Sequence, residues 1–282
     1  MAIKFITDSA SDISQDEAKR LGIRVIPLTV TFGETSYKDG VDLDHDGFYH
    51  KLIETDDFPR TSQVSPYEYE EIFNEETANG DEVICITISS KLSGCFQSAN
   101  IAIEECEGKV YAVDSENVTV GQRNLILMGL SLAKEGKSAQ EIVDILNAEK
   151  KNIRLIALLD TLEYLKKGGR INAAVAAAGA LLSIKPVIAI VDGEVSFLGM
   201  ARGSKNGNNK LIELVKKESG IDFKKPFYLA YTGHSKAMLE KYIDDSKSLY
   251  EEYNGELPIS SVGCAIGTHI GPGAIALSYF IK

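Results

Sequence analysis

Three short stretches of this 282-residue chain concentrate the residue types that hold anions. They are Thr61-Ser62-Gln63, Ser89 to Gly94, and Gly267 to Gly273, the last with His269 between glycines. We expect all three in loops, where backbone N–H groups at a helix start attract negative charge and Ser or Thr hydroxyls add further donors. Each stretch alone is equally consistent with ordinary turns and caps. Together, and with Arg170 added, they favour a site for an anionic ligand.

The elements that would position these residues follow an alternating order. Predicted strands at 3–7, 83–88 and 110–113 each run into Asp or Ser just before a helical segment. A further strand is predicted over 24–32. Such alternation is typical of parallel sheets built from βαβ units, whose ligands bind beyond the carboxyl ends of the strands. The fold class is therefore predicted as α/β, with the polar residues at the ligand-binding edge.

The second half of the chain follows a looser pattern. We expect a boundary near residue 150, with an N-terminal α/β domain at 1–150, a C-terminal α/β domain at 151–282, and the ligand between them. Predicted elements there include an alanine-rich helix at 172–182, a strand at 184–191, a hairpin turn at Asp192-Gly193 and a helix at 208–218. The small side chains of the alanine-rich helix would suit either a nearby elongated ligand or tight helix-on-sheet packing.

Composition and charge narrow the possible functions. The chain is 44% hydrophobic and 25% charged, as in folded globular proteins, and its formal charge of −11 disfavours nucleic acid as a partner. The acidity is local, because residues 34–82 hold 15 acidic and 3 basic side chains, whereas residues 154–217 hold 5 acidic and 10 basic ones. Four cysteines without a CxxC pair, and no apparent targeting or membrane-spanning segment, predict a cytoplasmic protein with reduced thiols.

Several motifs that would indicate other chemistry are incomplete. Asp42 to Gly47 matches the first half of an EF-hand loop, but its twelfth position is Ile53, so we expect a capped helix over 46–54 and no calcium. The four histidines form no HxxxH or HExxH pair, which predicts no metal site. Neither a nucleotide-binding glycine motif nor a GxSxG nucleophile elbow is present.

Seven short motifs resemble the DegV family of bacterial fatty-acid-binding proteins. In chain order they are Thr7-Asp8-Ser9, Thr61-Ser62-Gln63, Leu92-Ser93-Gly94, Asp114-Ser115, Leu159 to Ile171, Ser183 to Pro186 and Gly267 to Gly273. They extend over nearly the whole chain. Val64 stands where the family often has proline, and Cys95-Phe96 where it often has Thr-Tyr, which removes a hydroxyl.

The resemblance implies a two-domain carrier for one long-chain fatty acid. Thr61 and Ser93 would bind the carboxylate, Arg170 and His269 would complete the polar network, and Ser62 and Gly94 would lie beside it. A separate fatty acid kinase would phosphorylate the presented carboxylate for phospholipid synthesis, docking near Arg202 and Lys205. A basic face would meet membranes transiently. No cofactor is implied besides the bound fatty acid.

The alternative hypothesis is an enzyme that acts on an acyl or phosphorylated substrate. Ser93 would be its nucleophile and His269 its general base, with Asp8 or Asp114 orienting the histidine. The missing motifs favour the carrier. A carrier needs an enclosed apolar tunnel, because burying one methylene contributes about 0.8 kcal/mol. The alanine-rich helix and the strand at 184–191 are its predicted walls.

Overall fold

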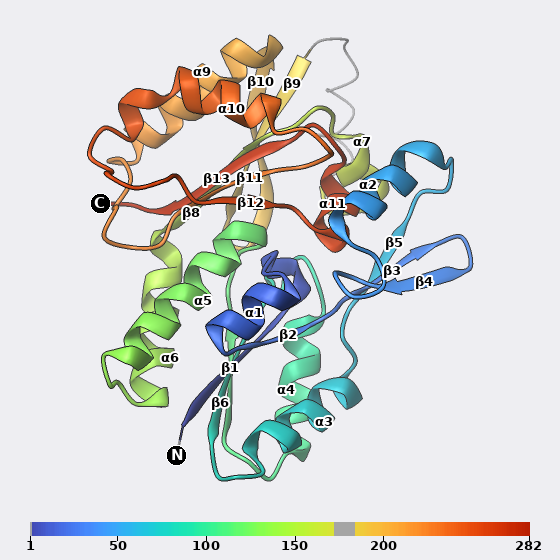
Figure 1. Ribbon diagram of the computed structural model, residues 1–282, viewed down its shortest axis with the longest axis vertical. Coiled ribbons are helices and arrows are strands. Elements are labelled where there is room, and N and C mark those ends of the chain that lie inside the picture. Colours follow the sequence, from blue (N-terminus) through green and yellow to red (C-terminus); the bar gives the residue numbers. More distant parts are fainter. Residues whose placement is uncertain (1, 172–183) are drawn as a thin grey trace.

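Two main sheets, one from each half of the chain, occupy the lower and upper parts of the molecule (Figure 1). The computed structural model describes residues 2–171 and 184–282. The lower sheet has four parallel strands in the order β2-β1-β6-β7. Its members are β1 (Ile3–Asp8), β2 (Arg24–Ile26), β6 (Glu82–Thr87) and β7 (Val110–Asp114).

Helices cover both faces of this lower sheet, as expected for a parallel sheet. Ile84 and Ile86 of β6 pack in one apolar cluster with α5 (Thr119–Lys134) and α6 (Ala139–Glu149), while Val83 and Cys85 face α3 (Pro66–Thr77) and α4 (Cys95–Glu105). The short elements η1 (Ser9–Ser11), α1 (Gln15–Leu21) and η2 (Lys150–Asn152) complete this part. The α/β class predicted from the sequence is confirmed.

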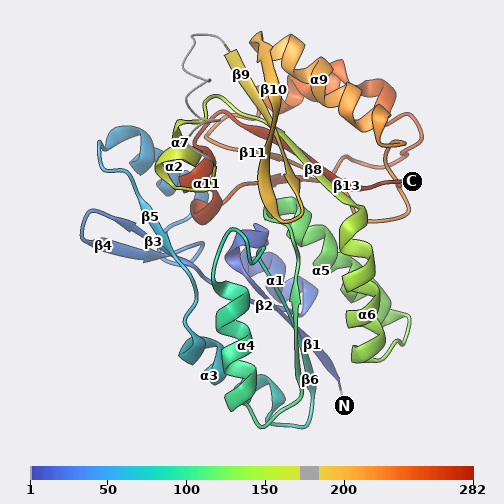
Figure 2. The same ribbon diagram turned by 180° about the vertical axis from the view of Figure 1, so that it is seen from behind.

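The upper sheet has six strands in the order β10-β9-β8-β13-β11-β12. They are β8 (Ile153–Leu158), β9 (Ile184–Val191), β10 (Glu194–Arg202), β11 (Tyr228–Tyr231), β12 (Ile259–Ser261) and β13 (Ile275–Phe280). Asp192 and Gly193 both have positive φ in the tight turn between β9 and β10, so the predicted hairpin is confirmed (Figure 2). The remaining helical elements here are α9 (Gly203–Lys217), α10 (Ala237–Asp245) and η4 (Lys247–Leu249).

A small third sheet and three helices lie beside the two main sheets. The sheet has the order β4-β3-β5, from β3 (Thr29–Phe32), β4 (Thr35–Lys38) and β5 (Arg60–Ser62). The helices are α2 (His45–Glu54), α7 (Glu163–Lys167) and α11 (Cys264–Ile270). In place of a calcium loop, Asp44 caps α2 by accepting from the Gly47 N–H at 2.8 Å.

Four local predictions were wrong. The strand expected over 24–32 is divided at Pro27 into β2 and β3, which belong to different sheets. Thr61 and Ser62 lie in β5 rather than in a loop, and Gly267 to Ile270 lie in α11. Helix α9 begins at Gly203, five residues before its predicted start. The alanine-rich helix expected at 172–182 lies outside the described residues.

A largely buried group of polar residues, the polar seam, joins the two halves of the chain and consists of Asp12, Asp39 and Arg123. Asp12 accepts from the Gly263 N–H at 2.8 Å, and Asp39 accepts from the Cys264 and Ala265 N–H groups at 3.0 and 3.2 Å. Arg123 donates to the Asp12 carbonyl and to Ser260. These contacts fix the start of α11 through residues that are far away in sequence, so local sequence patterns do not reveal them.

Burial leaves the carboxyl groups of the seam with unusual proton affinities. It raises the pKa of Asp12 to about 7 against the opposing hydrogen bond from Thr119, and it raises the pKa of Asp39. The pKa of nearby Asp8 is raised to about 6 for the same reason.

Candidate functional site

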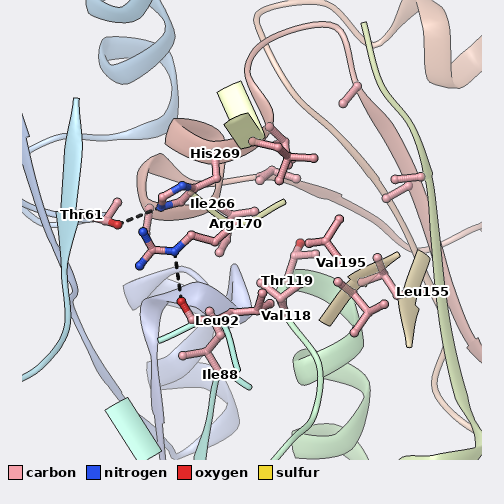
Figure 3. Close-up of a pocket in the computed structure, with 18 of the residues that line it drawn as sticks. Thr61, Ile88, Leu92, Val118, Thr119, Leu155, Arg170, Val195, Ile266 and His269 are labelled. Atoms are coloured by element: carbon pink, nitrogen blue, oxygen red, sulfur yellow. Dashed lines mark hydrogen bonds between the residues drawn. The ribbon is translucent and has the colours of Figure 1, made fainter. Parts of the chain in front are cut away.

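An apolar cavity of about 330 Å³ lies between the upper sheet and the carboxyl ends of the lower strands (Figure 3). Its volume is within the range of small-molecule sites. Ile88, directly after β6, and Val118, just before α5, line its lower side. Its upper side includes Leu155 of β8, Ile188 and Ile190 of β9 and Val195 of β10. The cavity is thus at the sheet edge predicted for ligands, and β9 is one of its walls, as expected.

Three alanines form a continuous row on the upper side of this cavity, here called the alanine row. Ala157 of β8 pairs with Ala276 of β13, which pairs in turn with Ala230 of β11. On its other side Ala157 pairs with Ile188 of β9. Neighbouring strands are about 4.8 Å apart, so the row forms a flat surface of short side chains across three adjacent strands. Methyl side chains there leave the space that larger residues would fill.

The polar end of the cavity contains all six residues predicted from the motifs. Thr61, Ser62, Ser93, Gly94, Arg170 and His269 all line it. In Figure 3 the labelled Thr61, Arg170 and His269 lie at one end, and Leu155 and Val195 lie at the other. The structure therefore brings together four stretches of chain that are far apart in sequence.

A hydrogen bond between Thr61 and His269 closes this polar end. Thr61 Oγ1 and His269 Nε2 are 2.8 Å apart, which joins β5 to α11. Burial, with a smaller contribution from Arg170, lowers the pKa of His269 to about 4, so the imidazole is neutral at pH 7. Its Nδ1 atom is buried and has no hydrogen-bond partner among the described residues. A neutral imidazole adds no charge to the site and holds Thr61 in a fixed position.

Ser93 and Gly94 approach the site through the start of α4. Gly94 is the N-cap of this helix, and a Cβ atom there would lie 1.9 Å from Gln63 Oε1. Gln63 donates in turn to Ser98 of α4 at 2.8 Å. Glycine thus allows the 61–63 segment to pack against α4, and Thr61 and Ser93 line the same cavity. The Ser93 hydroxyl donates only to the weak acceptor Cys95 Sγ, at 3.3 Å, among the described residues.

Arg170 connects the segment after α7 to the loop before α4. Its Nε atom donates to the Leu92 carbonyl at 3.2 Å, and a terminal nitrogen donates to the Gly168 carbonyl at 2.7 Å. Gly168 has no room for a side chain, because a Cβ atom would lie 2.1 Å from His269 Nδ1. Arg170 brings a positive charge to the polar end, and it forms no ion pair with any carboxylate of residues 2–171 and 184–282.

The geometry does not form the catalytic pair that the enzyme hypothesis requires. His269 bonds to Thr61, and Ser93 bonds to Cys95, so the proposed base and nucleophile are not joined. Asp8 bonds to Ile88 and Gln122, and Asp114 bonds to Ser90 and Glu116. Neither carboxylate orients His269.

The remaining predicted residues lie elsewhere. Arg202 ends β10 and Lys205 lies in the first turn of α9, both exposed and neither lining the cavity. Within 2–171 and 184–282, no group of three or more His, Cys, Asp or Glu side chains could hold a metal ion. No helix in these ranges is long and apolar enough to cross a membrane.

The sequence analysis missed the alanine row and the contribution of β8, β11 and β13. An alternation signal was present in β8, where Leu155 and Ala157 face the cavity while Ile156 and Leu158 pack in a cluster on the other side. Which strands are neighbours cannot be read from such alternation, so the row itself has no local signal.

Two α/β parts that enclose an apolar cavity with a hydroxyl-lined end define a protein of the small-molecule-binding class. The chain belongs to the DegV family, because the family model described as "uncharacterised protein, DegV family" matches residues 2–282. A DegV domain-containing protein of Caldanaerobacter subterraneus is 36% identical over 284 residues, with 98% of each chain covered. The resemblance inferred from the seven motifs is confirmed.

Solved structures of the family share this fold. A DegV family protein from Thermus thermophilus, described for its fatty acid binding, has a TM-score of 0.87 and 31% identity over 100% of both chains. DegV from Bacillus subtilis, described as a fatty acid binding protein, has a TM-score of 0.86 and 30% identity over 100% of both chains. A stearic-acid-binding protein from Eubacterium ventriosum has a TM-score of 0.86 and 28% identity, covering 100% of this chain and 99% of the other. These names describe binding rather than catalysis.

Proposed function

We propose that this protein is a carrier that binds one long-chain fatty acid, with the acyl chain in the apolar cavity and the carboxylate at its polar end. The observation that carries the proposal is that a single cavity joins aliphatic walls to all six motif residues. The relatives described as fatty acid binding support it.

The polar end would hold the carboxylate mainly through hydroxyl groups. Taking a carboxylate out of water costs several kcal/mol unless it is paired and hydrogen-bonded. Thr61 and Ser93 would donate to its oxygens, and Arg170 would supply positive charge nearby. If His269 Nε2 carries the proton, it donates to Thr61 and leaves the threonine hydroxyl hydrogen free for the ligand. Ser62 and Gly94 would border the head group.

The apolar end would supply most of the affinity. At about 0.8 kcal/mol per methylene, the roughly 14 methylenes of palmitate contribute on the order of 11 kcal/mol before ordering costs. The alanine row and Ile188 provide a wall for part of that chain. The alanine-rich helix at 172–182, predicted as the second wall, lies outside the described residues.

The second part of the proposal is presentation of the carboxylate to a fatty acid kinase in the cytoplasm. The protein would contribute no catalytic residue and no cofactor, and the kinase would dock near Arg202 and Lys205. Transient contact with a membrane surface would load or release the acid. Residues 1–150 and 151–282 would act as the two domains that close on it, which is supported by the separate origins of the two main sheets.

Native mass spectrometry of the purified protein, followed by extraction of the bound material, tests the first part. We expect an added mass that matches one fatty acid per chain. A protein that stays empty after incubation with palmitate, or that hydrolyses acyl esters, would contradict the carrier.

A further inference from the structure

A second cavity, here called the hairpin pocket, adjoins the β9–β10 hairpin, which extends from the upper sheet towards the lower half of the molecule (Figure 2). Its volume is about 510 Å³, within the range of small-molecule sites. Both halves of the chain line it, with Glu116 and Lys150 from the lower half and Ala189 and Leu198 from the hairpin. Ile190 is the one lining residue that it shares with the apolar cavity, within the described part of the chain.

One end of the hairpin pocket is apolar. Ala189 of β9 pairs with Ile156 of β8, and both line the pocket and pack in the cluster on the face of the sheet opposite the alanine row. Leu198 of β10 and Leu214 of α9 add two partly buried aliphatic side chains. Ala189 leaves space that a larger side chain would fill. This end therefore suits a short hydrocarbon group.

Charged side chains follow the apolar end along the same strand and the same helix. Arg154 lies two residues before Ile156 in β8, so the two side chains share a face of the strand. Lys217 lies three residues after Leu214 in α9, so these two share a face of the helix. The pocket is therefore amphipathic, with an apolar end and a charged end.

Two ion pairs are formed by residues of the charged end. Lys150 pairs with Glu116, and Arg154 pairs with Glu218, each at 2.9 Å. Arg154 also donates to the Lys151 carbonyl at 2.9 Å, which places the backbone of Lys151 beside its ion pair. Because Glu218 directly follows Lys217 in the chain, these contacts bring both lysines next to Arg154.

Positive charge is in excess among the lining groups that these pairs leave over. Lys151 and Lys217 form no ion pair with the part of the chain that the structure describes. Asp192 in the hairpin turn is the one lining carboxylate without such a pair among the same residues. The charged end thus has two free cations against one free carboxylate, which favours an anionic group on a ligand.

Tyr279 adds an unused hydrogen-bond donor at the charged end. It lies opposite Arg154 in the pairing of β13 with β8, and it lines the pocket. The side chain is fully buried, and its hydroxyl has no hydrogen-bond partner among the described residues. Burial raises the pKa of this hydroxyl, so it keeps its proton and can donate. A buried hydroxyl without a partner is destabilising, and an acceptor on a ligand would remove that penalty.

We propose that the hairpin pocket is a second ligand site, which binds a small carboxylate with a short hydrocarbon chain. The hydrocarbon lies against Ala189 and Leu198, and the carboxylate lies between Lys151 and Lys217, where charged donors form the stronger hydrogen bonds to an anion. This site goes beyond the proposed function, because its ligand lies on the opposite face of the upper sheet from the long-chain fatty acid.

The test titrates octanoate into protein already loaded with palmitate. We expect saturable binding of one octanoate per chain. Lys151→Gln and Lys217→Gln should each weaken octanoate binding about threefold, as is typical of exposed cations. Lys216→Gln is the matched control, because Lys216 is exposed on the same helix and does not line the pocket. Asp192→Asn should strengthen binding about twofold, because it removes the free carboxylate.

A second pair of variants locates the bound octanoate. Ala189→Leu fills the apolar end and should weaken octanoate binding about tenfold, as expected when roughly two methylenes lose their place. Ala148→Leu is the matched control, because Ala148 is exposed on α6 and does not line the pocket. Octanoate affinity that is the same in wild type and Ala189→Leu would place the ligand elsewhere, including the apolar cavity, and would overturn the proposal.

The outcomes separate this inference from the proposed function. No saturable octanoate binding up to about 5 mM, or equal losses in the lysine variants and Lys216→Gln, would show that the hairpin pocket is not a carboxylate site. A wild-type protein that fails to bind palmitate would contradict the proposed function instead. The octanoate titration then uses the unloaded protein, and Ala189→Leu still decides whether octanoate occupies the hairpin pocket.

Discussion

The polar end of the cavity is assembled from four separated stretches of chain, whereas its upper apolar wall is one face of a single sheet. Thr61, Ser93, Arg170 and His269 come from a strand, a loop, a segment after a helix and a short helix. The alanine row, in contrast, is fixed by backbone pairing between adjacent strands. The polar end can therefore change if the two halves move, while the apolar wall moves as one body.

The polar seam connects these two regions. Asp12 and Asp39 hold the first residues of α11, and the last turn of that helix carries His269. The carboxylates thus fix the histidine indirectly, from the opposite half of the chain. The comparison separates three roles that substitutions can test one at a time: affinity in the apolar wall, alignment in the seam and orientation of the ligand at the polar end.

The largest expected effect is on affinity, from filling the alanine row. Ala157→Leu should weaken palmitate binding roughly 50-fold, equivalent to displacing three methylenes at about 0.8 kcal/mol each. Ala189→Leu is the matched control, because Ala189 lies on the neighbouring strand and packs in the cluster on the other face of the sheet. Calorimetric titration measures both. Equal losses in the two variants would show that the row is not the wall for the acyl chain.

The second effect is a pH dependence of stability that comes from the seam. Asp12 has a pKa of about 7 in the folded protein against 3.8 when unfolded, so the folded state binds the proton more tightly. Its contribution to the free energy of unfolding therefore increases as pH falls through 7, by on the order of 2 kcal/mol between pH 8 and about 5.5. Asp8 acts in the same direction at lower pH.

Urea unfolding of wild type and Asp12→Asn over this pH range measures that contribution. The asparagine keeps an acceptor for the Gly263 N–H and removes the titrating group. We expect the difference between the two proteins to increase with acidity in favour of the wild type. A difference that does not vary with pH would mean that Asp12 is charged throughout.

The third effect separates orientation from affinity at the polar end. Ser93→Ala or Thr61→Ala should reduce phosphoryl transfer by a fatty acid kinase about tenfold, because each loses a hydrogen bond to a charged group. Palmitate retention should change less, by about threefold or under, since the acyl chain supplies most of the affinity. Kinase assays measure the loss of phosphoryl transfer, and equilibrium binding on the same preparations measures the loss of palmitate affinity. Equally large losses of phosphoryl transfer and of palmitate binding would contradict the assignment of orientation to the polar end and of affinity to the apolar end.

The smallest effect is expected at the predicted docking residues. Arg202→Glu with Lys205→Glu should slow kinase coupling and exchange with anionic vesicles a few fold, because rim charges act mainly on association rates. Palmitate affinity should stay unchanged. Lys216→Glu, exposed farther along α9, is the control. If coupling and exchange are unaffected, the two residues are only solvated surface.

The same contrast explains what could be predicted from the sequence. The six motif residues were predicted because each lies in a short motif, and the structure places all six along one cavity beyond strands that end before helices. The elements around three of them were predicted wrongly: Thr61 and Ser62 lie in β5, and His269 lies in α11. Helix α11 begins where Asp12 and Asp39 accept hydrogen bonds from its first N–H groups, and these residues are more than 220 positions away in sequence. A short glycine-containing segment without a local cap looks like a loop until that contact is known.

The apolar wall could be predicted only in part. The strand at 184–191 was predicted as a wall, and Ile188 and Ile190 line the cavity. Ala157, Ala230 and Ala276 were missed because their meeting depends on the order and register of β8, β13 and β11. Alternation within one strand shows which residues share a face. Which strands become neighbours, and in which register, is determined by tertiary packing.

A crystal structure of the protein with palmitate tests the division between the two ends most directly. We expect the carboxylate within hydrogen-bonding distance of Thr61 Oγ1 and Ser93 Oγ, with the acyl chain against Ala157 and Ala276. A carboxylate that lies away from both hydroxyls, or an acyl chain outside the cavity under the upper sheet, would contradict the account.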